Sequence, residues 1–345
     1  MKLRHPRTGA LYTRESDGLV RVEDGGAVGF FRPDGRYVRG SLRAADPHFT
    51  GWVGGPQLAP PERPAAPRHA GVPLPTFSPV RARGPEPTRR SPDMDLGLSG
   101  RKALVTGASR GIGLAIARAL VDQGADVAIC ARAPGALESA RKELEARGAK
   151  VFARSVDVAD GAALAAFVEE SASALGGLDV FVANASAGAG AGEAAWQAGF
   201  EIDLLSAARG VQAALPRLTA SDAGSIVFIA STAALEYLGV PQPYNAMKAA
   251  LIAHAHDLSQ SLARQGVRVN VVSPGPIYFE GGNWQRIEQT MPAIYKLALA
   301  QCAIGRMGTP EEVARVVVFL ASPAASLVTG ANLVVDGGFT KGVHY

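Results

Sequence analysis

A tyrosine and a lysine four residues apart, Tyr244 and Lys248, have the types and spacing that point most directly to chemistry. In a helix this spacing places both side chains on one face. A phenol, with a reference pKa of about 10, is a poor acid–base catalyst at neutral pH. A neighbouring ammonium favours the phenolate and brings proton transfer to an alcohol or carbonyl oxygen within reach. Ser231, upstream of both, offers a hydroxyl to hold the same oxygen, so these three residues form the predicted catalytic set.

A glycine-rich turn at residues 106–113 is a second candidate site. It follows a short apolar run and opens into a helical pattern of apolar residues. Backbone amides in such a turn can approach a pyrophosphate, and the helix N-terminus adds partial positive charge. The Gly-x-x-x-Gly-x-Gly spacing is not the commoner Gly-x-Gly-x-x-Gly, so the turn needs support from its context. The predicted dinucleotide contacts here are Gly107, Ser109, Arg110, Gly111, Ile112 and Gly113.

The elements that must position these motifs form an α/β fold, because apolar β-branched runs alternate with helical patterns from residue 96 onward. Strands are predicted at 103–106, 127–131, 151–155, 180–183, 225–230, 268–272 and 333–335. Helices are predicted near 113–123, 134–147, 160–175, 193–218, 243–265 and 310–321. This pattern predicts a doubly wound parallel sheet of seven strands with right-handed crossovers. Ligands of such sheets bind beyond the carboxyl ends of the strands, where all of these motifs fall.

The residues after the second and third strands bear on the cofactor. A cofactor with a free ribose diol usually meets an acidic side chain after the second strand. Here Ala131 removes that acceptor and Arg132 supplies a cation suited to a 2′-phosphate, to which Arg110 could add a second charge. We therefore expect NADP(H) to be preferred over NAD(H); the alternative is an arginine that only caps the following turn. Asp157 accepts either from the adenine amino group or from loop amides, and Asn184 either pins the neighbouring loops or contacts the cofactor.

These motifs together resemble the short-chain dehydrogenase/reductase family, in its compact single-domain branch. The resemblance covers residues 96–345 and implies a Rossmann fold. The residues that carry it are 106–113, Asp157, Asn184, Ala185, Ser231, Tyr244, Lys248, 273–277, 306–312, 329–330 and 335–338.

The resemblance also implies roles for the site residues. Tyr244 would be the general acid in reduction and the general base in oxidation, Lys248 would also hydrogen-bond the nicotinamide ribose, and Ser231 would orient the carbonyl. Residues 274–277 would line the nicotinamide. The cofactor contacts implied beyond the glycine turn and Arg132 are Asp157, Val158, Asn184, Ala185, Tyr244, Lys248, Pro274, Gly275 and Ile277.

Two positions depart from the family pattern. The usual Asn-Asn-Ala-Gly after the fourth strand is Ala-Asn-Ala-Ser at residues 183–186, which keeps the central Asn184 and Ala185. Asp203 stands where the family usually has an Asn that bends the helix and helps to hold a relay water. Asp is nearly isosteric and could preserve the bend, but its charge could also act on the lysine.

The leading functional hypothesis is an NADPH-dependent carbonyl reductase, with 3-oxoacyl thioesters among its candidate substrates. The alternatives are an alcohol or hydroxysteroid dehydrogenase working in the oxidative direction and a non-catalytic NADP-binding sensor. The segment 278–303 is mostly apolar and is expected either to close over the substrate, with Gly281 and Gly282 as hinge, or to pack at a subunit interface. The family resemblance implies a homodimer or homotetramer.

Composition and charge limit the classes of partner and the cellular location that the sequence allows. Apolar runs are too short to span a bilayer and no signal peptide is recognisable, so we expect a cytoplasmic protein with no membrane partner. Cys130 and Cys302 make neither a disulfide framework nor a metal cluster, and no metal is expected. Residues 1–95 hold 15 Lys and Arg against 10 Asp and Glu, and the remainder holds 20 against 21. The basic residues are scattered and no recognised motif accompanies them, which argues against nucleic-acid binding.

The N-terminal extension has its own organisation. Residues 1–55 contain three β-prone runs, 19–22, 27–31 and 37–42, separated by turn residues, and predict a small β-rich module. Residues 56–95 predict a Pro-rich linker, with 11 prolines between positions 56 and 92. Residues 96–345 are the predicted catalytic domain. The module is small enough that we expect it to dock on the larger domain or on a partner not identified by the sequence. Its histidines, among them His5, are expected at the surface.

Overall fold

The computed structural model describes residues 2–5, 8–46, 49–50, 53, 95–237, 239 and 241–342. Contacts divide the chain into two compact units, Met1–Thr88 and Arg89–Tyr345. The predicted linker lies almost entirely outside the described residues. The domain boundaries predicted from the sequence therefore stay predictions.

The N-terminal unit is an antiparallel meander of five strands rather than the three expected. The strands are β1 (Lys2–Arg4), β2 (Leu11–Arg14), β3 (Val20–Asp24), β4 (Ala27–Phe31) and β5 (Tyr37–Gly40). The first two were not expected because strands of three and four residues are too short to show alternation. The meander buries Tyr12, Val22 and Phe31 in its own core. The expectation that His5 lies at the surface was wrong: it is only 8% exposed, and its ring lies 4.5 Å from that of Phe49.

The larger unit is built on a parallel sheet of seven strands in the order β12-β11-β10-β9-β6-β7-β8. All seven predicted strands are confirmed, each within two residues of the expected bounds. They are β6 (Lys102–Thr106), β7 (Asp126–Ala131), β8 (Val151–Ser155), β9 (Val180–Ala183), β10 (Ser225–Ile229), β11 (Arg268–Pro274) and β12 (Asn332–Val335). Strand order reverses between β9 and β6, so the crevice for a ligand lies at the carboxyl ends of these two strands.

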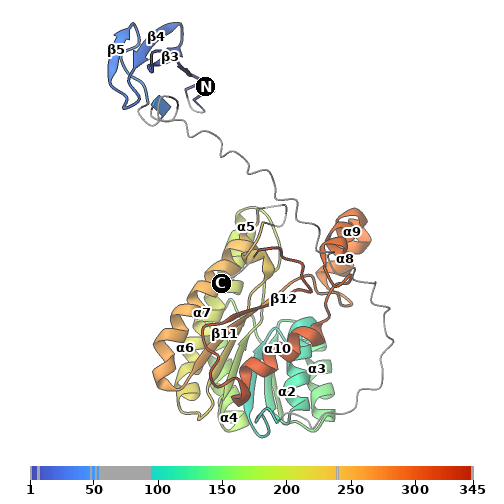
Figure 1. Cartoon of the computed structure of the whole chain (residues 1–345). Coiled ribbons are helices and arrows are strands. Elements are labelled where there is room, and N and C mark those ends of the chain that lie inside the picture. The colour runs from blue at the N-terminus through green and yellow to red at the C-terminus, as the bar shows by residue number, and fades with distance from the viewer. Residues whose placement is uncertain are drawn as a thin grey trace, which may run out of the picture. The chain divides into compact units, whose positions relative to one another are not determined.

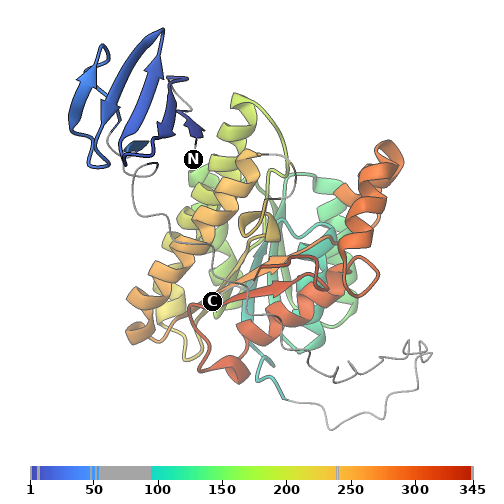
Figure 2. The ribbon, with the colours of Figure 1, turned by 45° about the horizontal axis from the view of Figure 1, so that its top comes forward.

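Helices cover both faces of the sheet (Figures 1 and 2). The helices on one face are α2 (Gly111–Asp122), α3 (Pro134–Ala146) and α10 (Pro310–Ala321). Those on the other are α4 (Gly161–Leu175), α6 (Ser206–Thr219) and α7 (Pro243–Leu262). Successive residues of one strand serve the two faces: Val105 packs with Ile116 of α2, whereas Leu104 packs with Phe181 in the opposite cluster. This two-sided burial explains why the strands are continuously apolar.

Shorter helices stand at the carboxyl end of the sheet. After β9 the chain forms α5 (Glu193–Gly199), a π-helical segment η1 (Phe200–Leu205) and then α6. After β11 it forms α8 (Asn283–Thr290) and α9 (Pro292–Gln301), the helix pair in the segment expected to cover the site. Both α5 and the α8–α9 pair lie at the upper end of the domain in Figure 1. The sheet's carboxyl-terminal edge is thus flanked by segments inserted after β9 and β11.

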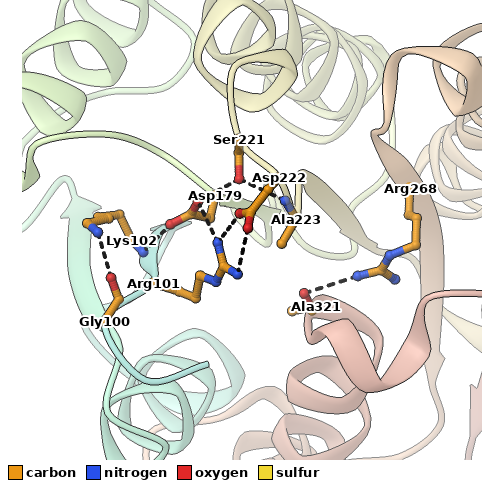
Figure 3. Close-up of polar contacts among 9 residues, drawn as sticks. All are labelled: Gly100, Arg101, Lys102, Asp179, Ser221, Asp222, Ala223, Arg268 and Ala321. Carbon is orange, nitrogen blue, oxygen red and sulfur yellow. Dashed lines mark hydrogen bonds and ion pairs between the residues drawn. The ribbon is translucent and has the colours of Figure 1, made fainter. Parts of the chain in front are cut away.

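The opposite, amino-terminal edge carries a polar cluster (Figure 3). Asp179 accepts hydrogen bonds from the Lys102 backbone amide at 2.8 Å and from the Ser221 hydroxyl at 2.6 Å. Arg101 pairs with Asp222, and this hydrogen bond raises the pKa of the Arg101 guanidinium. These contacts join the starts of β6, β9 and β10 and serve the fold, because they lie at the strand ends away from the ligand crevice.

Within the described residues, no helix combines the length and hydropathy needed to cross a membrane. The same residues contain no group of three His, Cys, Asp or Glu side chains arranged to hold a metal ion. Cys130 is fully buried in β7, and burial raises its pKa to about 12. Its thiol is therefore an inert packing group.

Candidate active site

The glycine-rich turn joins β6 to α2 and depends on two left-handed glycines. Gly107 has φ +67° and Gly111 has φ +55°, conformations that other residues adopt only with strain. Gly113 is required for a different reason. A Cβ atom there would lie 2.4 Å from the Gly107 carbonyl oxygen and 2.5 Å from Asn184 Nδ2, so only glycine lets the first turn of α2 pack this closely.

Asn184 holds the turn in place from the neighbouring strand. Its Nδ2 donates to the carbonyl oxygens of Thr106 at 2.9 Å and Gly107 at 3.1 Å. In return, Thr106 Oγ1 accepts from the backbone amides of Asn184 at 3.0 Å and Ala185 at 3.1 Å. The sequence left two roles open for Asn184, pinning the neighbouring loops or contacting the cofactor. These hydrogen bonds show it pinning the loops. The part played by the Thr106 hydroxyl was not anticipated, although Thr106 is the first residue of the predicted turn.

The turn and the adjoining strand ends fit a dinucleotide. The N-cap residue of α2, Arg110, provides no side-chain cap, so the first amides of the helix are open to an anion. Arg132 is exposed directly after β7, the strand next to β6. Asp157, after β8, accepts from the Ala159 amide at 3.1 Å, which is the loop-amide alternative for this residue. Val158 is buried beside it.

The three predicted catalytic residues lie after β10 and on α7. Ser231 follows β10 and caps the short helix η2 (Thr232–Ala234), its Oγ accepting from the Ala233 amide at 3.1 Å. Tyr244 and Lys248 lie one turn apart on α7, which packs against η2. Lys248 Nζ lies 5.7 Å from the centroid of the Tyr244 ring and donates to the Ile229 carbonyl oxygen at 2.8 Å. The lysine is 2% exposed, so solvent hardly screens the charge of its ammonium.

Asp203 completes the surroundings of the lysine. Its Oδ1 lies 3.0 Å from Lys248 Nζ, and both side chains are buried. Asp203 lies within η1, a π-helical turn of the kind often found at functional sites. The helix bend expected at this position is therefore present with Asp in place of Asn. The sequence marked Asp203 as a departure, but only the fold places it against the lysine.

The segment after β11 closes on the glycine turn. Pro274 is buried at the end of β11, and the chain is held by a bridge between Ile277 and Gly308. Beyond it, the Phe279 ring lies so close to Gly111 that a Cβ atom on that glycine would be 2.6 Å from it. Arg110 Nη1 donates to the Gly281 carbonyl oxygen at 3.1 Å. Phe279 was not predicted at the turn; its signal was its position just after the predicted nicotinamide loop.

The apolar residues of α8 and α9 divide into two groups. Trp284 and Tyr295 pack with Cys302, Met307 and Phe339 in a small core of their own. Met291, Ile294 and Leu297 remain large exposed hydrophobic side chains. Gly281, the predicted hinge, has φ +72°, which favours glycine. The helix pair is therefore a semi-independent unit joined to the domain by a glycine-containing connection.

Comparisons with known proteins match this geometry. A family model described as enoyl-(acyl carrier protein) reductase matches residues 107–340. The isoepoxydon dehydrogenase of Penicillium expansum is 37% identical over 254 residues, which span 72% of this chain and 98% of that protein. The 3-oxoacyl-[acyl-carrier-protein] reductase of Chlamydia pneumoniae is 32% identical over 252 residues, 72% of this chain and 100% of that one.

Solved structures agree with these relatives. L-sorbose reductase from Gluconobacter frateurii, in complex with NADPH and L-sorbose, superposes with a TM-score of 0.67 at 33% identity, covering 72% of this chain and 100% of its own. A Pseudomonas aeruginosa short-chain oxidoreductase bound to NADPH superposes with a TM-score of 0.66 at 32% identity, covering 72% and 99%. The chain therefore belongs to the short-chain dehydrogenase/reductase family and is an NAD(P)-dependent oxidoreductase of carbonyl and alcohol groups.

Proposed function

We propose that this chain is an NADPH-dependent carbonyl reductase in which Ser231, Tyr244 and Lys248 are the catalytic residues. The observation that carries the proposal is the buried Lys248 ammonium, 5.7 Å from the Tyr244 ring on the same helix face. A cofactor-binding protein without catalysis has no need of a phenol and an ammonium held together in this way.

The residues divide the work of reduction. NADPH held at this site would supply the hydride that reduces the carbonyl carbon. Ser231 holds the carbonyl oxygen by a hydrogen bond, and Tyr244 gives its phenolic proton to that oxygen. Lys248, fixed through the Ile229 carbonyl, stabilises the phenolate left behind. In oxidation the same phenolate removes the proton of the alcohol.

The preference for NADPH over NADH rests on Arg132. Its exposed side chain follows β7 in the place where an acidic residue would otherwise meet the ribose hydroxyls. Arg110 contributes a second cation if it exchanges its bond to Gly281 for the phosphate. The glycine turn, Asp157, the Asn184-Ala185 loop and the loop at 274–277 complete the proposed cofactor site.

The proposed substrate class is an apolar carbonyl compound, such as a 3-oxoacyl thioester. The aromatic and aliphatic residues of α8 and α9 favour it over a sugar. The names of the relatives range from an isoepoxydon dehydrogenase to an L-sorbose reductase, so they leave the substrate and direction open. We also propose that the protein is cytoplasmic, that it forms a homo-oligomer and that its N-terminal module binds a partner.

The proposal is tested by titrating NADPH and NADH, followed by a screen of carbonyl compounds for cofactor oxidation. We expect NADPH-dependent turnover that Tyr244→Phe abolishes while the variant still folds and binds NADPH, because the ring is kept and the proton donor is lost. Retained turnover in this variant would remove Tyr244 from its assigned role. Tight NADPH binding without turnover on any carbonyl or alcohol would instead favour a cofactor-binding sensor.

The cofactor preference has its own variant. Arg132→Glu should weaken NADPH binding by about tenfold or more and leave NADH affinity nearly unchanged, because an acidic side chain repels the 2′-phosphate. Equal weakening of both cofactors would mean that Arg132 does not contact that phosphate.

A further inference from the structure

A buried ion pair lies directly behind the proposed proton donor. Asp203 is 1% exposed and Lys248 is 2% exposed, and Oδ1 of the first lies 3.0 Å from Nζ of the second. Opposite charges this close interact strongly when water is excluded. An asparagine of the same shape would fill the same space without charge, so the feature specific to this chain is the negative charge beside the ammonium.

The second carboxylate oxygen of Asp203 has a separate partner. Oδ2 accepts from the Ala187 backbone amide at 3.0 Å. Ala187 follows the Asn184-Ala185 bridge that holds the glycine turn. Asp203 therefore ties the lysine to the loop after β9, and through that loop to the proposed cofactor site.

Both arginines on the elements around the pair have ionic partners of their own. The titratable groups on η1 and on the helices packed against it, besides the pair itself, are Glu193, Glu201, Arg209, Arg217, Tyr244, His254, His256 and Asp257. Arg209 pairs with Glu201 at 3.3 Å, and Arg217 pairs with Glu169. Of the described groups, Lys248 is thus the ionic partner of Asp203, and Tyr244 is the titratable group that faces the lysine.

We propose that Asp203 is a positioning residue whose carboxylate fixes Lys248 and sets the pH range in which Tyr244 transfers its proton. The inference rests on the proposed function of Tyr244. The carboxylate offsets part of the positive charge that the phenol experiences, so it weakens the stabilisation that the ammonium gives to the phenolate. Removing the charge without removing the side chain separates this effect from packing.

The test compares the wild-type protein with Asp203→Asn and Asp203→Glu. Two readouts are followed against pH: the rate of NADPH oxidation with the best carbonyl of the screen, and the ultraviolet absorbance of the Tyr244 phenolate, obtained by subtracting the Tyr244→Phe background. We expect Asp203→Asn to move the midpoint of both curves to lower pH by about one unit. Asp203→Glu keeps the charge, so its midpoint should stay while kcat falls because the lysine is displaced.

A matched control removes a carboxylate from the other edge of the sheet. Asp179 is 8% exposed and is hydrogen-bonded to Lys102 and Ser221, but it lies at the amino-terminal edge (Figure 3). Asp179→Asn should lower thermal stability without moving either midpoint. Should Asp203→Asn not fold, Asp203→Ser is smaller, also uncharged, and expected to shift the curves in the same direction.

The outcomes separate the inference from the proposed function. If the wild-type protein turns over no carbonyl, the proposed function is wrong. The phenolate titration then still measures the effect of Asp203 on Tyr244. If the midpoints of the uncharged variants coincide with those of the wild type, Asp203 is structural only and the inference is wrong. A uniform fall in rate at every pH overturns it equally, since loss of packing alone produces that result.

Discussion

Replacing Asn184 with alanine tests how the cofactor turn is held. The side chain makes two hydrogen bonds, at 2.9 Å and 3.1 Å, to the consecutive carbonyl oxygens of Thr106 and Gly107. Each bond of this kind contributes about 0.5–1.5 kcal/mol, so losing both costs about 2 kcal/mol. The alanine also leaves a space beside Gly113, which packs against the same amide.

The cost should appear mainly as weaker cofactor binding. In the variant the Thr106 hydroxyl still accepts from the backbone amides of residues 184 and 185, and Arg110 still donates to Gly281, but the carbonyl oxygens of Thr106 and Gly107 lose the donor that they share. The cofactor must then order this part of the turn on binding. A cost of about 1.4–2 kcal/mol corresponds to a dissociation constant for NADPH raised about tenfold to thirtyfold. Fluorescence titration of NADPH measures this constant directly, and urea unfolding measures any loss of global stability in the same samples.

A second buried asparagine provides the control. Asn270 of β11 is fully buried, donates to the Val328 carbonyl oxygen at 2.8 Å and accepts from the Ala331 amide at 3.1 Å. Asn270→Ala should lower the unfolding free energy by a similar amount and leave NADPH affinity within about twofold. If Asn184→Ala also leaves the affinity within that range, the turn does not depend on the Asn184 side chain and the reasoning fails.

Two further predictions concern stability. At the end of α10, Arg268 donates to the carbonyl oxygens of Leu320 at 2.7 Å, Ala321 at 3.2 Å and Ser322 at 3.0 Å. Arg268→Met keeps an apolar stem but loses these bonds, so it should lower the free energy of urea unfolding by about 2–3 kcal/mol. A loss below about 0.5 kcal/mol would show that Arg268 does not cap this helix. The pair with Arg306 lowers the pKa of Glu312 from 4.5 to about 2, so its stabilisation is complete above pH 4.5 and is lost as the pH falls toward 2. The stability difference between the wild type and Glu312→Gln should therefore be smaller at pH 3 than at pH 7, and a difference independent of pH would contradict this sign.

Much of the fold could be predicted from the sequence because its signals are local. Continuous apolar runs such as 180–183 identify strands that are buried on both faces, and the alternation with helical patterns identifies a parallel sheet. The strands β1 and β2 were not predicted because three or four residues are too few to show alternation; they are paired by the fold, β1 with β2 and β2 with β3.

The types of the site residues were likewise determined by the sequence alone. Tyr244 and Lys248 share a helix face by their spacing, and Gly107 and Gly111 lie in a strand–turn–helix corner. Family membership follows from the order of such motifs along the chain, which needs no coordinates.

The tertiary structure decided which of these residues touch. Asp203 and Lys248 are 45 positions apart in the sequence, and Arg110 and Gly281 are 171 apart. No local pattern encodes such pairs, because they arise only when the sheet brings the carboxyl ends of separate strands to one edge. The charge of Asp203 was legible in the sequence, but its placement 3.0 Å from the lysine ammonium depends on the π-helical turn and the packing of η1 on α7.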